Sequence, residues 1–473
     1  MHAKPLSLLF LSSLSSFAVA EDVLGLYIFH RHGDRTAKAW KPVNFTALGA
    51  DEVHSSGAWY RDTYVSEDAE RKIKGLSTDS AVVSQLDVTS PVDAVLQNSA
   101  LVFLQGLYPP TKQVETLANG SKIEAPLSGY QYIPIASVES AASDKNSESS
   151  AWLQGNSGCT NAEASSNEYF SSSDYNQIYK DTKKFYQDLL PVIEKTYGKK
   201  AANFQNAYTI YDLINVARIH NSSISSDDLL TESTLDKLYN YASIHEWNLA
   251  FNRSEPVRAI AGSVLAGQIL EALEPIAEGK KAPKVNIQFG AYAAFMAFFG
   301  LADLDKTDSD FMGVVDYASS MAFELVTNAT KPTADDVSVR FYFANGTAAE
   351  NTPKLFPLFN GKETTISWKD FKDGMNEFAI EDTKHWCKVC GNTDGTCASG
   401  SDDGDDDSAS SQSSSGGSGN GVSKPVAGVI GALVTLVVIL GVQAAVLLLG
   451  GLRLVKKSTL AAGGEPKSSA VKA

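Results

Sequence analysis

Positive charge is scarce in this sequence. Lysine and arginine together number 40, against 55 aspartates and glutamates, so the formal net charge is −15 at pH 7. Proteins that bind nucleic acids need a basic surface to neutralise phosphates, and we therefore expect no nucleic-acid partner. The sequence also lacks an internal repeat. Its 473 residues exceed one average domain and can bury a large core.

Charge is nearly absent from two apolar segments. Residues 1–20 have a short basic start, an apolar run and an Ala-x-Ala ending at Ala20, the pattern of a secretory signal peptide. Residues 426–452 contain no charged side chain and are long enough to cross a bilayer. A lipid-anchor signal is the alternative for this second segment. Such signals normally end in the apolar tail, however, whereas a polar segment follows here.

The charges around the second apolar segment indicate its orientation. One lysine, Lys424, precedes it and several basic residues follow it, which places residues 453–473 in the cytosol. Residues 399–424 are almost entirely Ser, Gly and Asp, and cannot bury enough apolar surface to fold. We therefore expect a single-pass type I membrane protein of the secretory pathway, at the cell surface or on a vacuolar or other internal membrane. Its folded ectodomain, residues 21–398, would stand on an acidic stalk.

Asn-x-Ser/Thr sequons for N-linked glycosylation agree with this topology. All of them lie between the predicted signal peptide and the predicted transmembrane segment. The candidate glycosylation sites are Asn44, Asn119, Asn221, Asn252, Asn328 and Asn345.

Cysteine is rare as well. The sequence has Cys159, Cys387, Cys390 and Cys397. An even number in an oxidising compartment predicts two disulfides, with three possible connectivities. Zinc is the alternative for the Cys387-x-x-Cys390 spacing, but only His385 and Cys397 stand nearby as further ligands. We expect no metal and no other cofactor.

Strand and helix patterns alternate through the ectodomain. Val23–Phe29 is a continuous apolar run rich in strand formers, typical of a buried central strand, and Val285–Phe289 has a similar character. Residues 260–273 carry apolar side chains at helical spacing. Strands separated by long helical segments predict an α/β sheet covered on both faces. The long polar stretch at residues 137–173 predicts an insertion that caps this sheet.

A cluster of positive charge follows the first predicted strand, in "YIFHRHGDRT", Tyr27–Thr36. Ligands of open α/β sheets bind outside the carboxyl ends of the strands, so Arg31, His32 and Arg35 are expected at that edge. Gly33 would allow a close approach of the backbone. Two guanidinium groups beside an imidazole suit a phosphate, because arginine matches its oxygens bidentately and histidine can attack phosphorus. The alternative is a solvated basic loop.

This loop resembles the R-H-G-x-R-x-P motif of the histidine acid phosphatases, without the proline. The resemblance, to the fungal type, covers about residues 23–374. Residues 98–110 are similar to the family's helix before the cap, and residues 288–301 to its closing helix. The family's Leu-Thr-x-x-Gly, Gly and Arg-x-x-Tyr pattern is matched by Thr46, Gly49, Gly57, Arg61 and Tyr64. The resemblance implies a mixed sheet flanked by helices, with a mostly helical cap at about residues 112–255.

The resemblance also implies roles for the loop. His32 would be the nucleophile that forms a phosphohistidine, while Arg31 and Arg35 would bind the phosphoryl oxygens. Asp34 is a candidate substitute for the acid that protonates the leaving oxygen. The histidines outside the loop are expected to be ordinary surface or capping residues, namely His54, His220, His245 and His385.

Three further residues of the family's site are missing. The family has an arginine four places before a serine of the helix that leads to the cap, and counting back from Ser99 gives Val95. It also has a His-Asp pair at the end of the late strand, and this pair aligns with Gln288 and Phe289. Losing a general acid costs about 10²–10⁴ in rate, and losing a charge donor about 10²–10³.

Two functions therefore stay open. The first is a membrane-anchored phosphomonoesterase with an acidic optimum that acts through a phosphohistidine. The second is a pseudophosphatase that binds phosphate or phosphoesters as a sensor, adhesin or scaffold. A phosphoglycerate-mutase-like transferase shares the R-H-G loop, but the signal peptide and the helix before the cap argue against it.

Overall fold

A computed structural model describes residues 21–138, 158–221, 228–394 and 397–398 of the chain. The predicted signal peptide, the acidic stalk, the predicted transmembrane segment and the cytoplasmic tail lie outside these residues. Part of the polar stretch expected in the cap, residues 139–157, lies outside them too.

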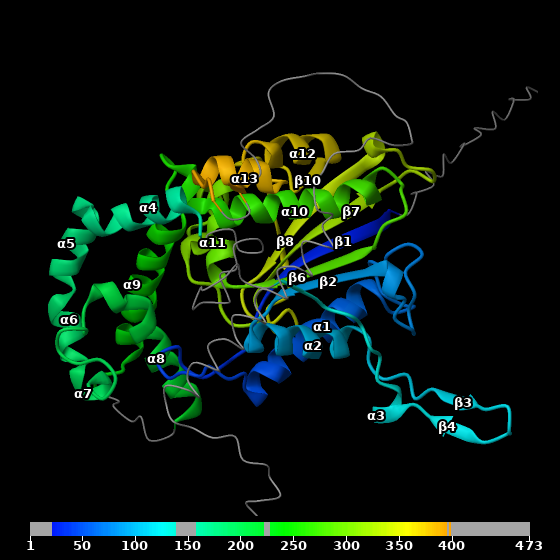
Figure 1. Ribbon diagram of the computed structural model, residues 1–473, viewed down its shortest axis with the longest axis horizontal. Coiled ribbons are helices and arrows are strands. Elements are labelled where there is room, and N and C mark those ends of the chain that lie inside the picture. Colours follow the sequence, from blue (N-terminus) through cyan, green and yellow to red (C-terminus); the bar gives the residue numbers. More distant parts are fainter. Residues whose placement is uncertain (1–20, 139–157, 222–227, 395–396, 399–473) are drawn as a thin grey trace, which may run out of the picture. The chain divides into compact units, whose positions relative to one another are not determined.

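A single mixed sheet forms the centre of the described part. Its strands follow the order β10-β8-β7-β1-β6-β2-β5, with β9 paired to β8 (Figure 1). The strands are β1 (Asp22–Arg31), β2 (Leu86–Pro91), β5 (Ala136–Val138), β6 (Val285–Gly290), β7 (Ser320–Thr327), β8 (Val337–Ala344), β9 (Lys354–Phe356) and β10 (Thr365–Ser367). β1 is parallel to β6 and antiparallel to β7, so the parallel and antiparallel halves of the sheet meet at β1.

The two predicted central strands are confirmed, and the reason for their apolar character is visible. Tyr27 and Phe29 of β1 face one buried cluster, while Leu26 and Ile28 face another. Side chains alternate across a strand, so a strand covered on both faces must be apolar at every position. All six residues of β6 are buried for the same reason.

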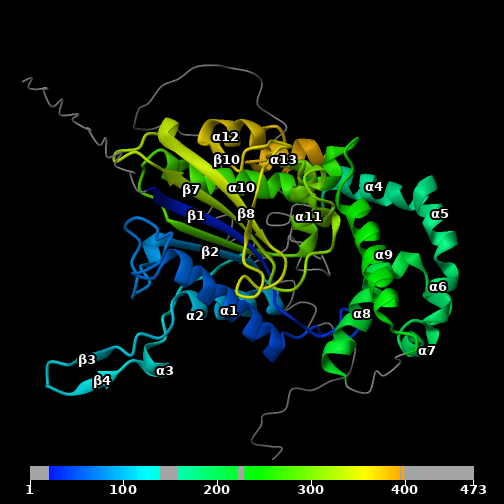
Figure 2. The ribbon, with the colours of Figure 1, turned by 180° about the vertical axis from the view of Figure 1, so that it is seen from behind.

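Helices cover both faces of the sheet, as expected. α1 and α2 pack on one face and α10, α11 and α12 on the other (Figures 1 and 2). The bounds of the helices around the sheet are α1 (Ala47–Tyr64), α2 (Ala94–Leu107), α10 (Ile260–Ala277), α11 (Tyr292–Leu301), α12 (Trp368–Asn376) and α13 (Thr383–Cys390). Short 3-10 helices are η1 (Val83–Gln85), η5 (Pro256–Ala259), η6 (Leu304–Lys306), η7 (Ser309–Met312) and η8 (Ala334–Asp336).

A helical cap is inserted between β5 and α10, again as expected. It has its own apolar core, which includes Tyr186, Phe204 and Ile210. Its described helices are α4 (Thr160–Glu168), η3 (Tyr169–Ser171), α5 (Ser173–Asp181), α6 (Lys183–Asp188), α7 (Leu190–Ile193), η4 (Phe204–Asn206), α8 (Ala207–His220) and α9 (Glu232–Ala250).

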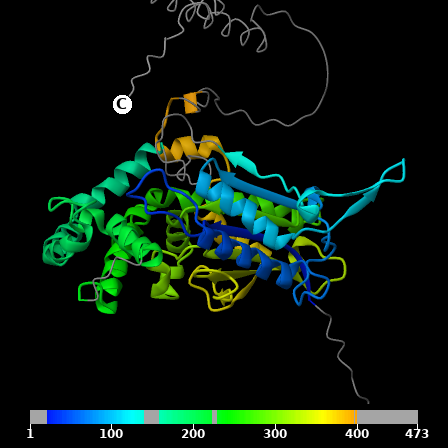
Figure 3. The ribbon, with the colours of Figure 1, turned by 90° about the horizontal axis from the view of Figure 1, so that it is seen from below.

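Residues 112–138, which the sequence placed in the cap, have a different structure. They form a small hairpin of β3 (Val114–Thr116) and β4 (Lys122–Glu124), the short α3 (Pro126–Gly129), and then β5 of the main sheet. The hairpin projects away from the sheet (Figures 1 and 3). The helical part of the cap therefore begins later in the chain than the resemblance implied.

Both predicted disulfides are present, and the structure selects one of the three connectivities. Cys159 pairs with Cys390, and Cys387 pairs with Cys397. Cys387 and Cys390 thus belong to different disulfides, which rules out the alternative of a shared zinc site. The first disulfide joins the start of α4 in the cap to the end of α13, far along the chain.

One stretch of the described residues has the length and composition of a membrane span. It is Pro256–Ala277, which comprises η5 and α10 and is mostly buried. α10 contributes to the core beside the sheet, so its apolar character is explained by packing.

Candidate functional site

The arginine-rich loop lies at the carboxyl end of β1, as predicted. Its backbone is fixed by the segment that leads into β7. Arg31 donates its backbone N–H to the carbonyl of Ser319 at 2.8 Å, and His32 accepts from the N–H of Ala318 at 2.9 Å. The loop is therefore held in place from the antiparallel side of the sheet.

Glycine is required where the loop packs against α1. A Cβ atom on Gly33 would lie 2.3 Å from the carbonyl oxygen of Gly49, and one on Gly49 would lie 2.2 Å from the carbonyl oxygen of Asp34. Thr46 caps α1 by accepting from the N–H of Gly49, and its hydroxyl also donates to the Asp34 carboxylate at 2.5 Å. Thr46 and Gly49 therefore hold the loop against the start of α1, which explains why they occur together with the motif.

The ring of His32 is oriented by its own backbone. Its Nδ1 lies 2.8 Å from the carbonyl oxygen of Gly33, and the side chain is 1% exposed. A carbonyl only accepts, so Nδ1 must carry the proton and the lone pair resides on Nε2. Nε2 is consequently the atom of His32 that is capable of nucleophilic attack.

Arg31 is surrounded by protein groups. Its guanidinium carbon lies 4.7 Å from the ring centre of Tyr317 and 5.4 Å from that of Tyr292. It also donates a hydrogen bond to the backbone carbonyl of Val315. Asp316 lines the same small pocket as Arg31; burial raises the pKa of this carboxyl group, and the charge of Arg31 opposes the shift.

Arg35 forms a buried ion pair with the cap. Its guanidinium lies 2.9 Å from the carboxylate of Asp212 in α8, and the two side chains are 0% and 3% exposed. It also donates to the hydroxyl of Tyr208, one helical turn before Asp212, at 3.3 Å. Sequence reasoning missed Asp212, because an aspartate on a predicted helix is usually exposed to solvent.

Further donors converge on Asp212. Its second carboxylate oxygen accepts from the backbone N–H of Lys38 at 2.8 Å, and the hydroxyl of Tyr317 lies 3.4 Å from the first. A guanidinium, a backbone N–H and a hydroxyl are the donors that proteins use for phosphate oxygens. The carboxylate of Asp212 therefore binds Arg35, which the sequence had assigned to a phosphate, together with two further donors of the same kind.

The cap also reaches Asp34, through a histidine expected to be an ordinary surface residue. Nε2 of His220, the last residue of α8, lies 2.6 Å from the carboxylate of Asp34. Asp34 is fully buried, and the same carboxylate oxygen accepts from Thr46. His220 is exposed at the end of α8, as expected of a surface residue, but it also makes the second contact between this helix and the motif.

A second unpredicted carboxylate lies behind the loop. Glu52 of α1 accepts from the backbone N–H of Asp34 at 2.7 Å. Burial raises the pKa of Glu52 to about 7; the hydrogen bond from Asp34 opposes this shift, while the nearby Asp34 and Glu350 carboxylates add to it. Nothing in the sequence distinguishes Glu52 from the solvated acidic residues of an exposed helix.

The cavity beside Arg31 is small. It measures about 20 Å³ and is lined by Arg31, Tyr208, Tyr211, Asp212, Asn215, Val314, Val315, Asp316 and Tyr317. Such a volume holds about one water molecule. A phosphoryl group is larger than this, so it can enter this cavity only if Asp212 or the tyrosines move.

Val95 lies where the sequence placed it, one turn before the serine that meets the loop. Ser99 accepts from the N–H of Gly33 at 3.2 Å and donates to the carbonyl of Val95 at 2.8 Å. Val95 is 1% exposed and sits in the first turn of α2. Val95, which the sequence comparison aligned with the family's third arginine, is thus a buried apolar residue.

Gln288 and Phe289, the residues aligned with the family's His-Asp pair, both lie within the sheet. Gln288 points to one face of the sheet, where it bonds to Tyr27 and Gln268, and Phe289 packs against Phe103 on the other. Both lie inside β6. Neither side chain therefore extends from the end of the strand toward the loop.

The residues that follow β6 are the ones near the loop. Ala291 and Tyr292 begin α11, and Tyr292 lies beside both Arg31 and Lys38. Its hydroxyl donates to Glu246 at 2.6 Å. Burial and the Glu246 charge raise the pKa of Tyr292 well above its usual value, which makes its phenol a weak acid.

The described fold matches that of known enzymes. No protein-family model and no curated protein matches the chain. Among solved structures, a phytase from Citrobacter braakii matches with a TM-score of 0.52 at 14% identity, covering 78% of this chain and 99% of that one. A Hafnia alvei phytase in complex with myo-inositol hexakis sulphate matches with a TM-score of 0.51 at 15% identity, covering 78% and 98%.

A phytase from D. castellii matches with a TM-score of 0.50 at 10% identity, covering 79% of this chain and 82% of that one. Together these likenesses identify the class of structure. The chain has the mixed α/β fold with a helical insertion of the histidine acid phytases, which are histidine acid phosphatases.

Proposed function

We propose that this protein is a pseudophosphatase: a membrane-anchored protein with the histidine-phosphatase fold whose loop binds anionic groups without hydrolysing phosphomonoesters. One observation carries the proposal. The carboxylate of Asp212 is buried against Arg35 and the backbone N–H of Lys38. A group of the chain itself therefore holds the donors that a substrate phosphate would need.

The chemistry of the neighbouring residues supports the same conclusion. Phosphoryl transfer depends on preorganised positive charge around the phosphoryl oxygens and on an acid for the leaving group. Arg35 is neutralised by Asp212, and Arg31 is bonded to a backbone carbonyl. Val95 is apolar, and the phenol of Tyr292 is a weaker acid than a carboxyl group.

Asp34 is a poor substitute for the missing acid. Its carboxylate is buried and accepts from Thr46 and His220, so it serves to join the loop to α1 and α8. Both contacts are made to the same oxygen of the Asp34 carboxylate. Asp34 therefore has a structural role in our proposal.

A specific observation favours a second candidate function, slow phosphomonoester hydrolysis through a phosphohistidine at His32. Nδ1 of His32 donates to Gly33, which leaves Nε2 as the nucleophile. This function requires Asp212 to leave Arg35 when a substrate enters. Because Asp316 and Glu52 are carboxyl groups of raised pKa near the loop, they are the candidate acids in that case.

The ligand that we propose is a phosphate or a phosphomonoester. The Hafnia alvei phytase of the same fold was solved with myo-inositol hexakis sulphate, a polyanion. A ligand of this kind would compete with Asp212 for Arg35. The ectodomain would face the outside of the cell or the lumen of an internal membrane compartment, where soluble phosphoesters are its accessible partners.

The test is hydrolysis of p-nitrophenyl phosphate, whose leaving group needs little protonation. We expect the full chain to release no more nitrophenol than the His32→Ala variant between pH 4 and about 8. Brief incubation with labelled substrate and quenching should likewise trap no acid-labile phosphoenzyme. A His32-dependent burst of product, or a trapped phosphohistidine, would establish the hydrolase instead.

A further inference from the structure

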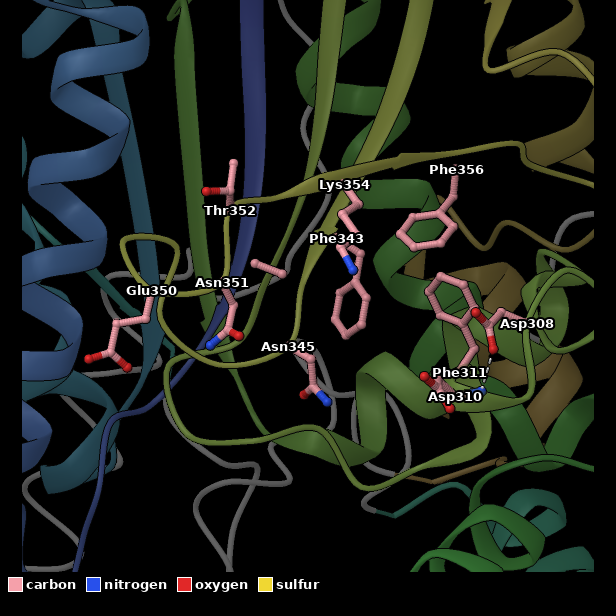
Figure 4. A pocket seen from close by; sticks show the side chains of 11 residues that line it. Asp308, Asp310, Phe311, Phe343, Asn345, Glu350, Asn351, Thr352, Lys354 and Phe356 are labelled. Carbon is pink, nitrogen blue, oxygen red and sulfur yellow. Dashed lines mark hydrogen bonds between the residues drawn. The ribbon is translucent and has the colours of Figure 1, made fainter.

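A pocket separate from the loop lies at the end of β8. It measures about 410 Å³ and is bordered by η7 on one side and by residues 350–356 on the other. Three aromatic rings, those of Phe311, Phe343 and Phe356, surround it (Figure 4). Its size is that of a small-molecule site.

The rest of the lining is polar. Apart from Ala344, it consists of Asp308, Asp310, Asn345, Glu350, Asn351, Thr352 and Lys354 (Figure 4). Apolar rings combined with several hydrogen-bonding groups suit a ligand that has both a C–H face and many hydroxyl groups. A sugar ring has this character.

Asn345 carries a sequon at the mouth of this pocket. It is the first residue of Asn345-Gly346-Thr347, at the turn that follows β8, where Gly346 has a φ of 97°. Its Oδ1 accepts from the backbone N–H of Asp316 at 2.8 Å and from the hydroxyl of Ser319 at 3.1 Å. With Oδ1 directed at these donors, Nδ2 points the other way, toward the side of the pocket formed by η7 (Figure 4).

We propose that this pocket binds the first sugar of an N-linked glycan attached to Asn345. The donor is a lipid-linked oligosaccharide pyrophosphate of the secretory pathway. Nδ2 forms a bond to the anomeric carbon of its N-acetylglucosamine, the bond from that carbon to the pyrophosphate oxygen breaks, and the pyrophosphate lipid leaves with the electron pair. One amide proton of Asn345 is released. The inference rests on the proposed secretory location.

The lining matches the chemistry of this sugar. Its C–H face can pack on the rings of Phe343 and Phe311, which lie on the pocket side of the turn. The carboxylates of Asp308, Asp310 and Glu350 can accept from its hydroxyl groups and its acetamido N–H. Phe311 and Phe343 are already only 2% and 8% exposed, so the sugar would cover their remaining exposed edges and the half-buried ring of Phe356.

A sugar bound in this pocket would also stabilise the conformation of the arginine-rich loop. Asn345 is bonded to Asp316 and Ser319, and Ser319 in turn accepts from the backbone of Arg31 at 2.8 Å. The glycan is attached to a side chain that is two hydrogen bonds away from the loop. Its removal should therefore reduce the stability of the fold, whereas glycans on exposed turns usually affect solubility.

The chain offers a matched control at Asn119. Asn119-Gly120-Ser121 is a second Asn-Gly sequon on a turn, with Gly120 at a φ of 83°. It joins β3 and β4 in the projecting hairpin, and a Cβ on Gly120 would meet nothing within 4 Å. A glycan at this position has no pocket to occupy.

The experiment uses the full chain made in a eukaryotic secretory host. Peptide mass spectrometry should find a glycan on Asn345. The Asn345→Asp variant keeps the accepting oxygen but removes the sequon, and should lower Tm by about 2–4 °C, while Asn119→Asp should change it by less than about 1 °C. Wild-type protein trimmed by an endoglycosidase to its first sugar should keep its Tm.

Two comparisons isolate the sugar. When both proteins are made with lipid-linked oligosaccharide synthesis inhibited, the Tm difference between wild type and Asn345→Asp should disappear. Thr347→Ser, which preserves the sequon, should retain both the glycan and the Tm. If every sequon is unmodified, the secretory topology is wrong. If other sequons are modified and Asn345 is not, or if losing its glycan matters no more than losing that of Asn119, this inference alone is overturned.

Discussion

The ion pair between Arg35 and Asp212 can be tested by removing the carboxylate. In Asp212→Ala, Arg35 stays buried without its anion, and so does the backbone N–H of Lys38. Breaking a buried pair by deleting one partner costs about 3–5 kcal/mol. At about 2 °C per kcal/mol for a large domain, Tm should fall by about 6–10 °C.

An added oxyanion should reverse much of this loss. Phosphate or tungstate that replaces the carboxylate binds the folded state, and at a concentration 100 times its Kd it contributes about 2.7 kcal/mol. This corresponds to a recovery of about 5 °C in the variant. In the wild type the same anion must displace Asp212, so we expect a much smaller shift at the same concentration.

The measurement is differential scanning fluorimetry against anion concentration, at constant ionic strength set with chloride. The double variant Asp212→Ala/Arg35→Ala is the control: it has no buried unpaired charge at this position and should lose the response to anions. The two single substitutions should also be non-additive, because their side chains are in direct contact. If Asp212→Ala responds to oxyanions no more than the wild type does, Asp212 does not occupy the anion position, and the reasoning behind the proposed function fails.

Two further predictions concern Glu52 and the topology. Burial raises the folded-state pKa of Glu52 from 4.5 to about 7, so its ionisation opposes folding; this cost is absent below about pH 4.5 and complete above about pH 7. Glu52→Gln should therefore raise the free energy of unfolding by about 2–3 kcal/mol at pH 8 and leave it unchanged at pH 4, as denaturant titrations at the two pH values can measure. For the topology, protease added outside intact cells should release a glycosylated fragment and spare an epitope on residues 453–473; a tail cleaved from outside contradicts the single-pass arrangement.

The position of the loop could be predicted because it depends on local rules. A long apolar run can only be a strand that is covered on both faces, and the residues that follow such a strand lie at the edge of the sheet. The same argument located Arg31, His32 and Arg35 together. It could not find the partners of Arg35 and Asp34, since His220 is 186 residues away from Asp34 and comes from a different layer of the fold.

The register of the late strand shows where pattern alone was insufficient. Gln288 and Phe289 were aligned with the family's His-Asp pair by counting back from Gly300, and the structure places both residues inside β6, with their side chains on opposite faces of the sheet. The pairing of β6 with β1 ends at Gly290, opposite Arg31. Only this pairing places Tyr292 next to the loop.

By itself, the sequence determined the central strands, the loop with its two arginines and its histidine, the number of disulfides and the presence of a helical cap. Each of these follows from residue type and short-range spacing. The tertiary structure decided which cysteines pair, and that Asp212, His220 and Tyr317 surround the loop. A polar residue on a helix looks the same in the sequence whether it faces water or a buried arginine. Only the position of α8 shows that Asp212 contacts Arg35. The loop that the sequence predicts to bind phosphate therefore binds a carboxylate of the same chain.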